Sequence, residues 1–137
     1  VIEIVGQVPS DKVKEYMESA NIFIGTSDSQ EGWGAVINES MNAGCALVAN
    51  RRMGAVPFLI KNNDNGFAYN TYKELEDKVK LLIKDKKLRE KLSKNAYKYI
   101  TEEWTSSIAA KNLIELFDSI INKTNYMVTE GPASKEK

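Results

Sequence analysis

The chain has 137 residues, 42% of them hydrophobic and 28% charged, and its 19 Lys and Arg residues balance 19 Asp and Glu residues. This length allows one globular domain with its own core, and without a basic excess we expect no nucleic-acid partner. The sequence contains no histidine, which excludes Ser-His-Asp and Cys-His triads and removes zinc's usual nitrogen ligand. The single cysteine, Cys45, cannot form an internal disulfide, so we expect a reducing, cytoplasmic environment and a small buried side chain.

Strand and helix signals alternate along the first half of the chain. Residues 1–5 (Val-Ile-Glu-Ile-Val) predict a buried strand that begins without Met or a signal peptide, which is typical of a piece of a longer protein. Residues 22–26 predict the next strand, and no segment approaches the roughly 18 apolar residues of a membrane span. Ser10 is a candidate N-cap, because apolar residues at helical spacing follow it at Val13, Tyr16, Met17 and Ala20.

The alternation continues after the second predicted strand. A loop over residues 27–33 leads to a helix predicted from about residue 34 to residue 43, which Gly44 ends. Residues 46–49 predict a third strand, and residues 67–69, which follow a dense turn signal, predict a fourth. Four short strands joined by partly helical connections predict parallel βαβ units and therefore an α/β fold.

The second half predicts three helices followed by a tail. Because the periodicity ends at about Lys123, we expect one domain over residues 1–122 and a flexible tail over residues 123–137. Lysines crowd the first two helices, and they fit either a solvated face or contact with an anionic membrane surface. Three apolar stripes mark the helices, namely Leu75, Val79, Leu82 and Ile83, then Leu88, Leu92, Ala96 and Tyr99, then Leu113, Ile114, Phe117, Ile120 and Ile121.

The most informative stretch is residues 31–39, Glu-Gly-Trp-Gly-Ala-Val-Ile-Asn-Glu. Its glycines lie between a strand end and a helix start, where the N–H groups of a first helical turn suit a phosphate. The loop also falls at the carboxyl end of a parallel strand, where ligands bind in open α/β sheets. Glu31 and Glu39 would flank a bound diphosphate and accept hydrogen bonds from hydroxyl groups. This pattern indicates a binding site for a nucleotide sugar. A common glycine turn, with two glutamates at this spacing by chance, would give the same pattern.

Glu31-x7-Glu39 resembles the E-x7-E signature of the retaining family-four glycosyltransferases of GT-B fold, also called glycosyl transferases group 1. The likeness runs in unbroken order over about residues 4–70. It implies a Rossmann-like parallel sheet with flanking helices, the C-terminal half of a GT-B enzyme, followed by a helical segment. The other matching segments resemble the family's G-x-V, S-A-D-V-x-V, G-x-P-V-V-A, G-G-V-P-E-L-I and N-G-x motifs, and they are residues 6–8, 19–24, 44–49, 54–60 and 65–67.

The resemblance implies a role for each matched residue. Glu39 would accept hydrogen bonds from ribose hydroxyls, and Glu31, the candidate catalytic residue, would hold hydroxyls of the transferred sugar. Glu31 can also be read as a covalent nucleophile, as in retaining glycosidases. We expect no metal and no cofactor, because GT-B enzymes bind their donors without one. Backbone groups around Val8 and in the segment after Glu31 would meet the base, the donor sugar and the diphosphate. Together with the Glu39 carboxylate, this gives as donor-binding residues Val8, Gly32, Trp33, Gly34, Ala35, Val36 and Glu39.

The activity that the resemblance implies is hexosyl transfer from a UDP- or GDP-sugar to a glycan or lipid-linked acceptor, in polysaccharide biosynthesis. Its partners would be the nucleotide-sugar donor and an N-terminal acceptor-binding domain of the same protein, with a peripheral contact at the inner face of the membrane. The family's phosphate-binding Arg and Lys would lie upstream, so we expect weak nucleotide binding and no transfer by this chain alone. Two alternatives stay open, a non-catalytic nucleotide-binding or interaction module and a GT-B-type sugar-nucleotide epimerase.

Some positions depart from the family pattern. Phe58 replaces a common Glu, and Trp33 stands where Phe is usual. We expect Trp33 to pack over the loop and Trp104 to lie in the core. Arg51 and Arg52 replace small residues, and they fit either a phosphate or acceptor contact or a plain exposed loop.

Overall fold

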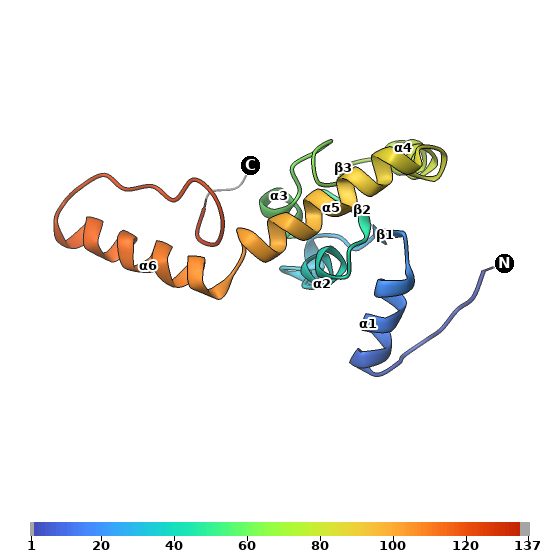
Figure 1. The fold of residues 1–137 in the computed structure, drawn as a ribbon, viewed down its shortest axis with the longest axis horizontal. Coiled ribbons are helices and arrows are strands. Elements are labelled where there is room, and N and C mark those ends of the chain that lie inside the picture. Colours follow the sequence, from blue (N-terminus) through green and yellow to red (C-terminus); the bar gives the residue numbers. More distant parts are fainter. Residues whose placement is uncertain (1, 135–137) are drawn as a thin grey trace.

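The structure, a computed structural model, describes residues 2–134 and has a small parallel sheet between helices (Figure 1). Its elements in chain order are α1 (Ser10–Ser19), β1 (Ile22–Gly25), the 3-10 helix η1 (Ser29–Glu31), α2 (Val36–Asn42), β2 (Ala46–Asn50), α3 (Val56–Leu59), β3 (Phe67–Tyr69), α4 (Tyr72–Lys84), α5 (Lys86–Glu102) and α6 (Ser106–Ile121).

The sheet has the order β1-β2-β3, and both pairs of neighbours are parallel. The register places Ile24 beside Val48 and Val48 beside Phe67. The central strand β2 is apolar and buried from Ala46 to Ala49, as expected for a parallel strand that is covered on both faces. The predicted α/β class with a parallel sheet and flanking helices is confirmed.

Each face of the sheet carries its own core. On one face, Leu47 and Ala49 pack with Ile37 of α2, Leu59 of α3 and Ile100 of α5. On the other face the packing comes mainly from α4, and the buried members are Ala46, Val48, Phe67, Tyr69, Leu82 and Leu92. Helix α5 crosses the middle of the molecule and supplies residues to both cores, so it holds the two layers together (Figure 1).

The predicted first strand is wrong for the residues that the structure describes. Ile2 and Ile4 are 94% and 92% exposed, and residues 2–5 run away from the sheet past α1 (Figure 1). A strand is stable only when it pairs along a ladder, and no described strand lies beside this segment. The described sheet therefore has three strands, and Val1 lies outside the described residues.

Two helix starts differ from the prediction. Ser10 is the first residue of α1, and Pro9, with an extended ψ of 154°, occupies the N-cap position without a side-chain cap. Helix α2 begins at Val36 because Gly34, with a φ of 80°, cannot belong to a right-handed helix. The end of α2 is as expected: Gly44 has a φ of 77° and donates to the Met41 carbonyl.

The three helices predicted for the second half are confirmed as α4, α5 and α6. Helix α6 projects from the sheet, and after Lys123 the chain turns and runs back along it (Figure 1). Residues 124–134 contain no helix or strand, although Val128 and Ser134 are buried, and residues 135–137 of the predicted tail lie outside the described part. One face of α6 is apolar and exposed, at Leu113, Ile114, Phe117, Ile120 and Ile121.

Candidate functional site

The glycine loop follows β1 and lies at the carboxyl end of the sheet. It begins at Asp28, whose carboxylate accepts from the Gln30 N–H at 2.9 Å and starts η1. Gly32 and Gly34 then take φ values of 65° and 80°, in the left-handed region that favours glycine. Ala35 stands at the N-cap position of α2, where no side chain makes a cap hydrogen bond.

A second loop, which follows β2, holds the glycine loop in place. The Gly54 N–H donates to the Gly32 carbonyl at 3.0 Å, and the Ala55 N–H donates to the Trp33 carbonyl at 2.7 Å. A Cβ atom at Gly54 would lie 2.2 Å from the Gly32 oxygen. Gly54 is therefore required by this close approach of two backbones, a role that its place in a motif does not reveal.

Trp33 packs over the loop, as predicted. Its ring centroid lies 5.5 Å from that of Phe58 and 5.8 Å from that of Trp104, and its Nε1–H donates to Asn38 Oδ1 at 2.9 Å. The side chain remains 41% exposed. The ring thus joins the glycine loop to α3 and to the residues that connect α5 and α6. Sequence reasoning assigned no role to Asn38, since no motif marks it.

A groove of about 540 Å³ lies between α1 and α2. Apolar side chains of Val13, Met17 and Val36 line it, together with the charged side chains of Lys14, Glu18 and Glu39. Glu39 is exposed, so its carboxylate is available to a ligand in the groove. The groove offers an apolar surface beside a carboxylate, which can receive an aromatic ring and accept hydrogen bonds from hydroxyl groups.

The structure brings together only part of the predicted site. Val36 and Glu39 line the groove, and Val8 is half-buried just before the first turn of α1. Among the described residues that line the groove, Glu31 does not appear; it is exposed at the end of η1. The remaining predicted residues form the loop between the two glutamates, where Gly32, Trp33 and Ala35 are exposed and Gly34 is buried.

The two other polar features named from the sequence have clear positions. Arg51 and Arg52 are exposed on the loop after β2, and their backbone N–H groups donate to the Tyr69 carbonyl and to Asn50 Oδ1, respectively. Cys45 is completely buried beside the Met17 carbonyl, 3.2 Å from its Sγ, and burial raises the pKa of its thiol. Such a thiol is a packing group, as predicted, and not a nucleophile.

Residues 2–134, the part of the chain that the structure describes, contain neither a cluster of metal ligands nor a helix that could span a membrane. Within it, no three His, Cys, Asp or Glu side chains gather as metal ligands would. None of the described helices combines the length and the apolar character needed to cross a bilayer.

A parallel α/β sheet with a glycine loop at the carboxyl ends of its strands defines a Rossmann-like domain. Residues 1–99 match the family model described as glycosyl transferases group 1, so the chain belongs to this family. The Bacillus subtilis (strain 168) protein YtcC, a putative glycosyltransferase by name, is 26% identical over 121 residues, which are 86% of this chain and 30% of that protein.

A second curated relative comes from Campylobacter jejuni (serotype O:2). It is named N,N'-diacetylbacillosaminyl-diphospho-undecaprenol alpha-1,3-N-acetylgalactosaminyltransferase and is 29% identical over 110 residues, 80% of this chain and 29% of that protein. The chain thus spans less than a third of the length of either curated relative.

Solved structures share the fold. The C-terminal domain of LpcC, a glycosyl transferase group 1 family protein from Francisella tularensis, matches with a TM-score of 0.63 and 29% identity over 73% of this chain and 50% of that one. Anabaena Alr3699/HepE matches with a TM-score of 0.65 and 24% identity over 77% of this chain and 29% of that one. The first of these likenesses assigns the chain to the C-terminal, Rossmann-like half of the family's architecture.

Proposed function

We propose that this chain is the donor-binding part of a retaining glycosyltransferase that transfers a hexosyl group from a UDP- or GDP-sugar to a glycan or lipid-linked acceptor. The observation that carries the proposal is the position of the E-x7-E pair. Glu31 ends η1 ahead of the two glycines of the loop, and Glu39 lines the groove after the loop, within the segment that matches the family.

Two relatives support the choice of substrates. The Campylobacter relative is named as an N-acetylgalactosaminyltransferase that acts on a diphospho-undecaprenol-linked sugar. Alr3699/HepE, which shares the fold, is solved with UDP, with UDP and glucose, and with UDP-glucose. A nucleotide-sugar donor and a lipid-linked or glycan acceptor are the substrates that these names favour.

Each part of the site has a task in this proposal. The apolar wall of the groove holds the nucleoside, with the base near Val8, and Glu39 accepts from the ribose hydroxyls. Backbone N–H groups of the Gly32–Val36 segment face the diphosphate and stabilise the negative charge that grows on the leaving group. Glu31 holds hydroxyls of the transferred sugar, so that the anomeric carbon is presented to the acceptor. A covalent role for Glu31 is the alternative that the paired carboxylates allow.

The proposal includes an N-terminal acceptor-binding domain of the same protein and a cytoplasmic site of action at the inner face of a membrane. A cleft between two domains would exclude water from the reaction and position the acceptor. It also includes donor binding without a metal or another cofactor. We expect the 137-residue chain alone to bind nucleotide weakly and to transfer no sugar.

The experiment that tests the proposal is a titration of the chain with UDP and with GDP, followed by ligand-observed NMR. Glu39→Gln keeps the shape of the side chain and removes its charge, so it should weaken binding about tenfold or more, as expected for a hydrogen bond to a charged group. Glu18→Gln is the matched control, because Glu18 lines the same groove from α1. Unchanged affinity in Glu39→Gln, or an equal loss in both variants, would contradict the ribose assignment.

A further inference from the structure

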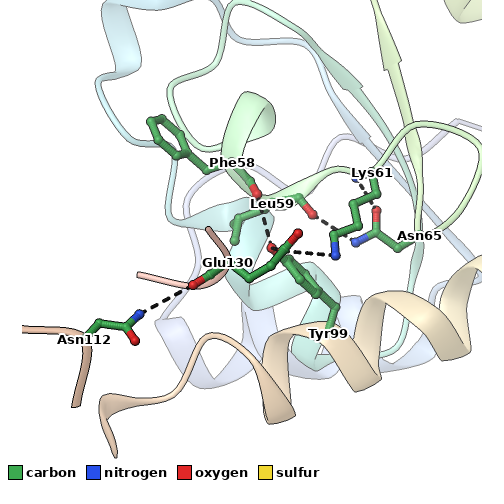
Figure 2. Close-up of polar contacts among 7 residues, drawn as sticks. All are labelled: Phe58, Leu59, Lys61, Asn65, Tyr99, Asn112 and Glu130. Carbon is green, nitrogen blue, oxygen red and sulfur yellow. Dashed lines mark hydrogen bonds and ion pairs between the residues drawn. The ribbon is translucent and has the colours of Figure 1, made fainter. Parts of the chain in front are cut away.

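The segment after α6 returns to the body of the molecule and is held there by Glu130 (Figure 2). Glu130 Oε2 lies 3.1 Å from Lys61 Nζ and 3.4 Å from the Tyr99 hydroxyl. On the other side, the Asn112 side-chain amide of α6 donates to the carbonyl of Glu130 at 3.4 Å and to that of Pro132 at 2.9 Å. The segment is therefore attached both to α6 and, through Lys61 and Tyr99, to the loop after α3 and to α5.

Residues 128–134, here called the strap, are packed as well as bonded. Val128 and Ser134 are each 8% exposed. Gly131 is buried with a φ of 78°, and a Cβ atom there would lie 2.8 Å from the Glu103 carbonyl oxygen. Asn112, whose amide fastens the strap, is itself only 7% exposed. The strap fits its place through both shape and hydrogen bonds.

The strap reaches the glycine loop by two routes. The Tyr99 hydroxyl that faces Glu130 also lies 3.5 Å from the Phe58 carbonyl oxygen (Figure 2). The Phe58 ring in turn packs on Trp33. The second route begins at Gly131, which lies against Glu103. The next residue, Trp104, packs its ring on Trp33 as well.

We propose that Glu130 is a positioning residue, which acts through Tyr99, Phe58 and Trp33 to hold the glycine loop in its present conformation. Glu130 is an exposed carboxylate paired with a partly exposed lysine, and such pairs are weak and sensitive to salt. The Glu130 contacts thus act as a latch that opens under mild conditions and loosens Trp33, while the Asn112 hydrogen bonds and the buried residues of the strap stay in place. The effect of this latch on nucleotide binding rests on the proposed function, and its effect on Trp33 does not.

The test uses tryptophan fluorescence, because the chain has two tryptophans and both lie at this junction. Trp104→Phe leaves Trp33 as the reporter, and among the described residues the Trp104 Nε1 has no hydrogen-bond partner to lose. In this background, Glu130→Gln and Gly131→Ala should each shift the Trp33 emission to longer wavelength and increase quenching by acrylamide. Glu90→Gln is the control, since Glu90 pairs with Lys86 on the exposed surface of α5.

Three outcomes decide the proposal. It is supported if both strap variants expose Trp33 while the far-UV circular dichroism stays unchanged, and if added salt exposes Trp33 in the Trp104→Phe protein and not in its Glu130→Gln variant. Equal quenching in the parent and both strap variants would overturn it. So would an equal increase in the control.

A second readout separates the strap from the proposed function. Where the parent chain binds UDP or GDP, Glu130→Gln should weaken binding about two- to fivefold, which is the range of a partly exposed ion pair. A parent chain that binds neither nucleotide would refute the proposed function, and the fluorescence result would still decide whether the strap holds Trp33.

Discussion

Gly54 shows how one residue without a side chain determines the shape of the site. Its N–H holds the Gly32 carbonyl at 3.0 Å, and the two backbones are so close that a methyl group does not fit between them. The loop after β2 therefore fixes the backbone path of the loop after β1. The motif marks the position of Gly54, and the reason for the glycine is visible only in the structure.

Gly54→Ala should lower the free energy of unfolding by about 1–3 kcal/mol, since either loop must move to relieve the overlap. Urea unfolding measures the change. Gly66→Ala is the control, because a Cβ there has its nearest contacts at an ordinary 3.4 Å and the backbone φ is not in the left-handed region. A smaller loss at Gly54 than at Gly66 would show that the two loops do not restrain each other.

Cys45 gives a prediction about pH. Burial raises the pKa of its thiol, so the folded chain keeps the proton at pH values where the unfolded chain releases it. Below the unfolded pKa, about 8.5, both states are protonated and the thiol has no influence on stability. Above it, the free energy of unfolding should fall as pH rises toward the folded-state pKa.

The comparison of the parent with Cys45→Ala between about pH 7.5 and 9.5 isolates this effect, because all other groups titrate in both proteins. The stability of the parent should decrease more steeply with pH than that of the variant. Identical slopes would show that the thiol is not buried in solution.

At the scale of elements, Asp85 joins two helices. Its N–H donates to the Leu81 carbonyl at the end of α4, and its carboxylate accepts from the Leu88 N–H at the start of α5, both at 2.9 Å. One residue therefore ends one helix and caps the next. Because α5 contributes residues to both cores, the hydrogen bond that caps its first turn helps to place a helix that packs on both faces of the sheet.

Asp85→Ala should reduce the free energy of unfolding by about 1 kcal/mol, the usual value of an N-cap. Asp85→Asn retains an acceptor at the same position and should cost less. Thermal or urea unfolding of the two variants gives the comparison. An equal loss in both would indicate that the negative charge at the helix start, and not the hydrogen bond, carries the effect.

The elements differ in how far the sequence predicts them. Helices α4, α5 and α6 follow from apolar stripes, because helical periodicity and side-chain caps are local properties. The strand prediction is wrong over residues 2–5, the described part of that segment, because an apolar pattern does not show whether a partner strand lies alongside. Helix α2 starts two residues later than its pattern predicts, because the left-handed φ of Gly34 does not follow from its being glycine.

For the whole molecule, the predictable part of the site is the loop and its glutamates. Their motif is continuous along the chain, so Glu31, the two glycines and Glu39 can be found from the sequence alone. The groove cannot, since it requires α1 to pack on α2. The contacts of Glu130 with Lys61 and Tyr99 join distant parts of the chain, and a tail-like composition conceals them.

The two attachments of the strap differ in how much chain each one encloses. The contact between Asn112 and Pro132 joins residues 20 positions apart, whereas Lys61 and Glu130 are much farther apart along the chain. Closing the larger loop from a free chain costs about 1 kcal/mol more entropy than closing the smaller one. When the Glu130 pair breaks, the Asn112 contact keeps the strap tethered. Glu130 therefore needs only a short local search to meet Lys61 again. The Glu130 contacts therefore break easily and, because Asn112 keeps the strap nearby, they also re-form quickly.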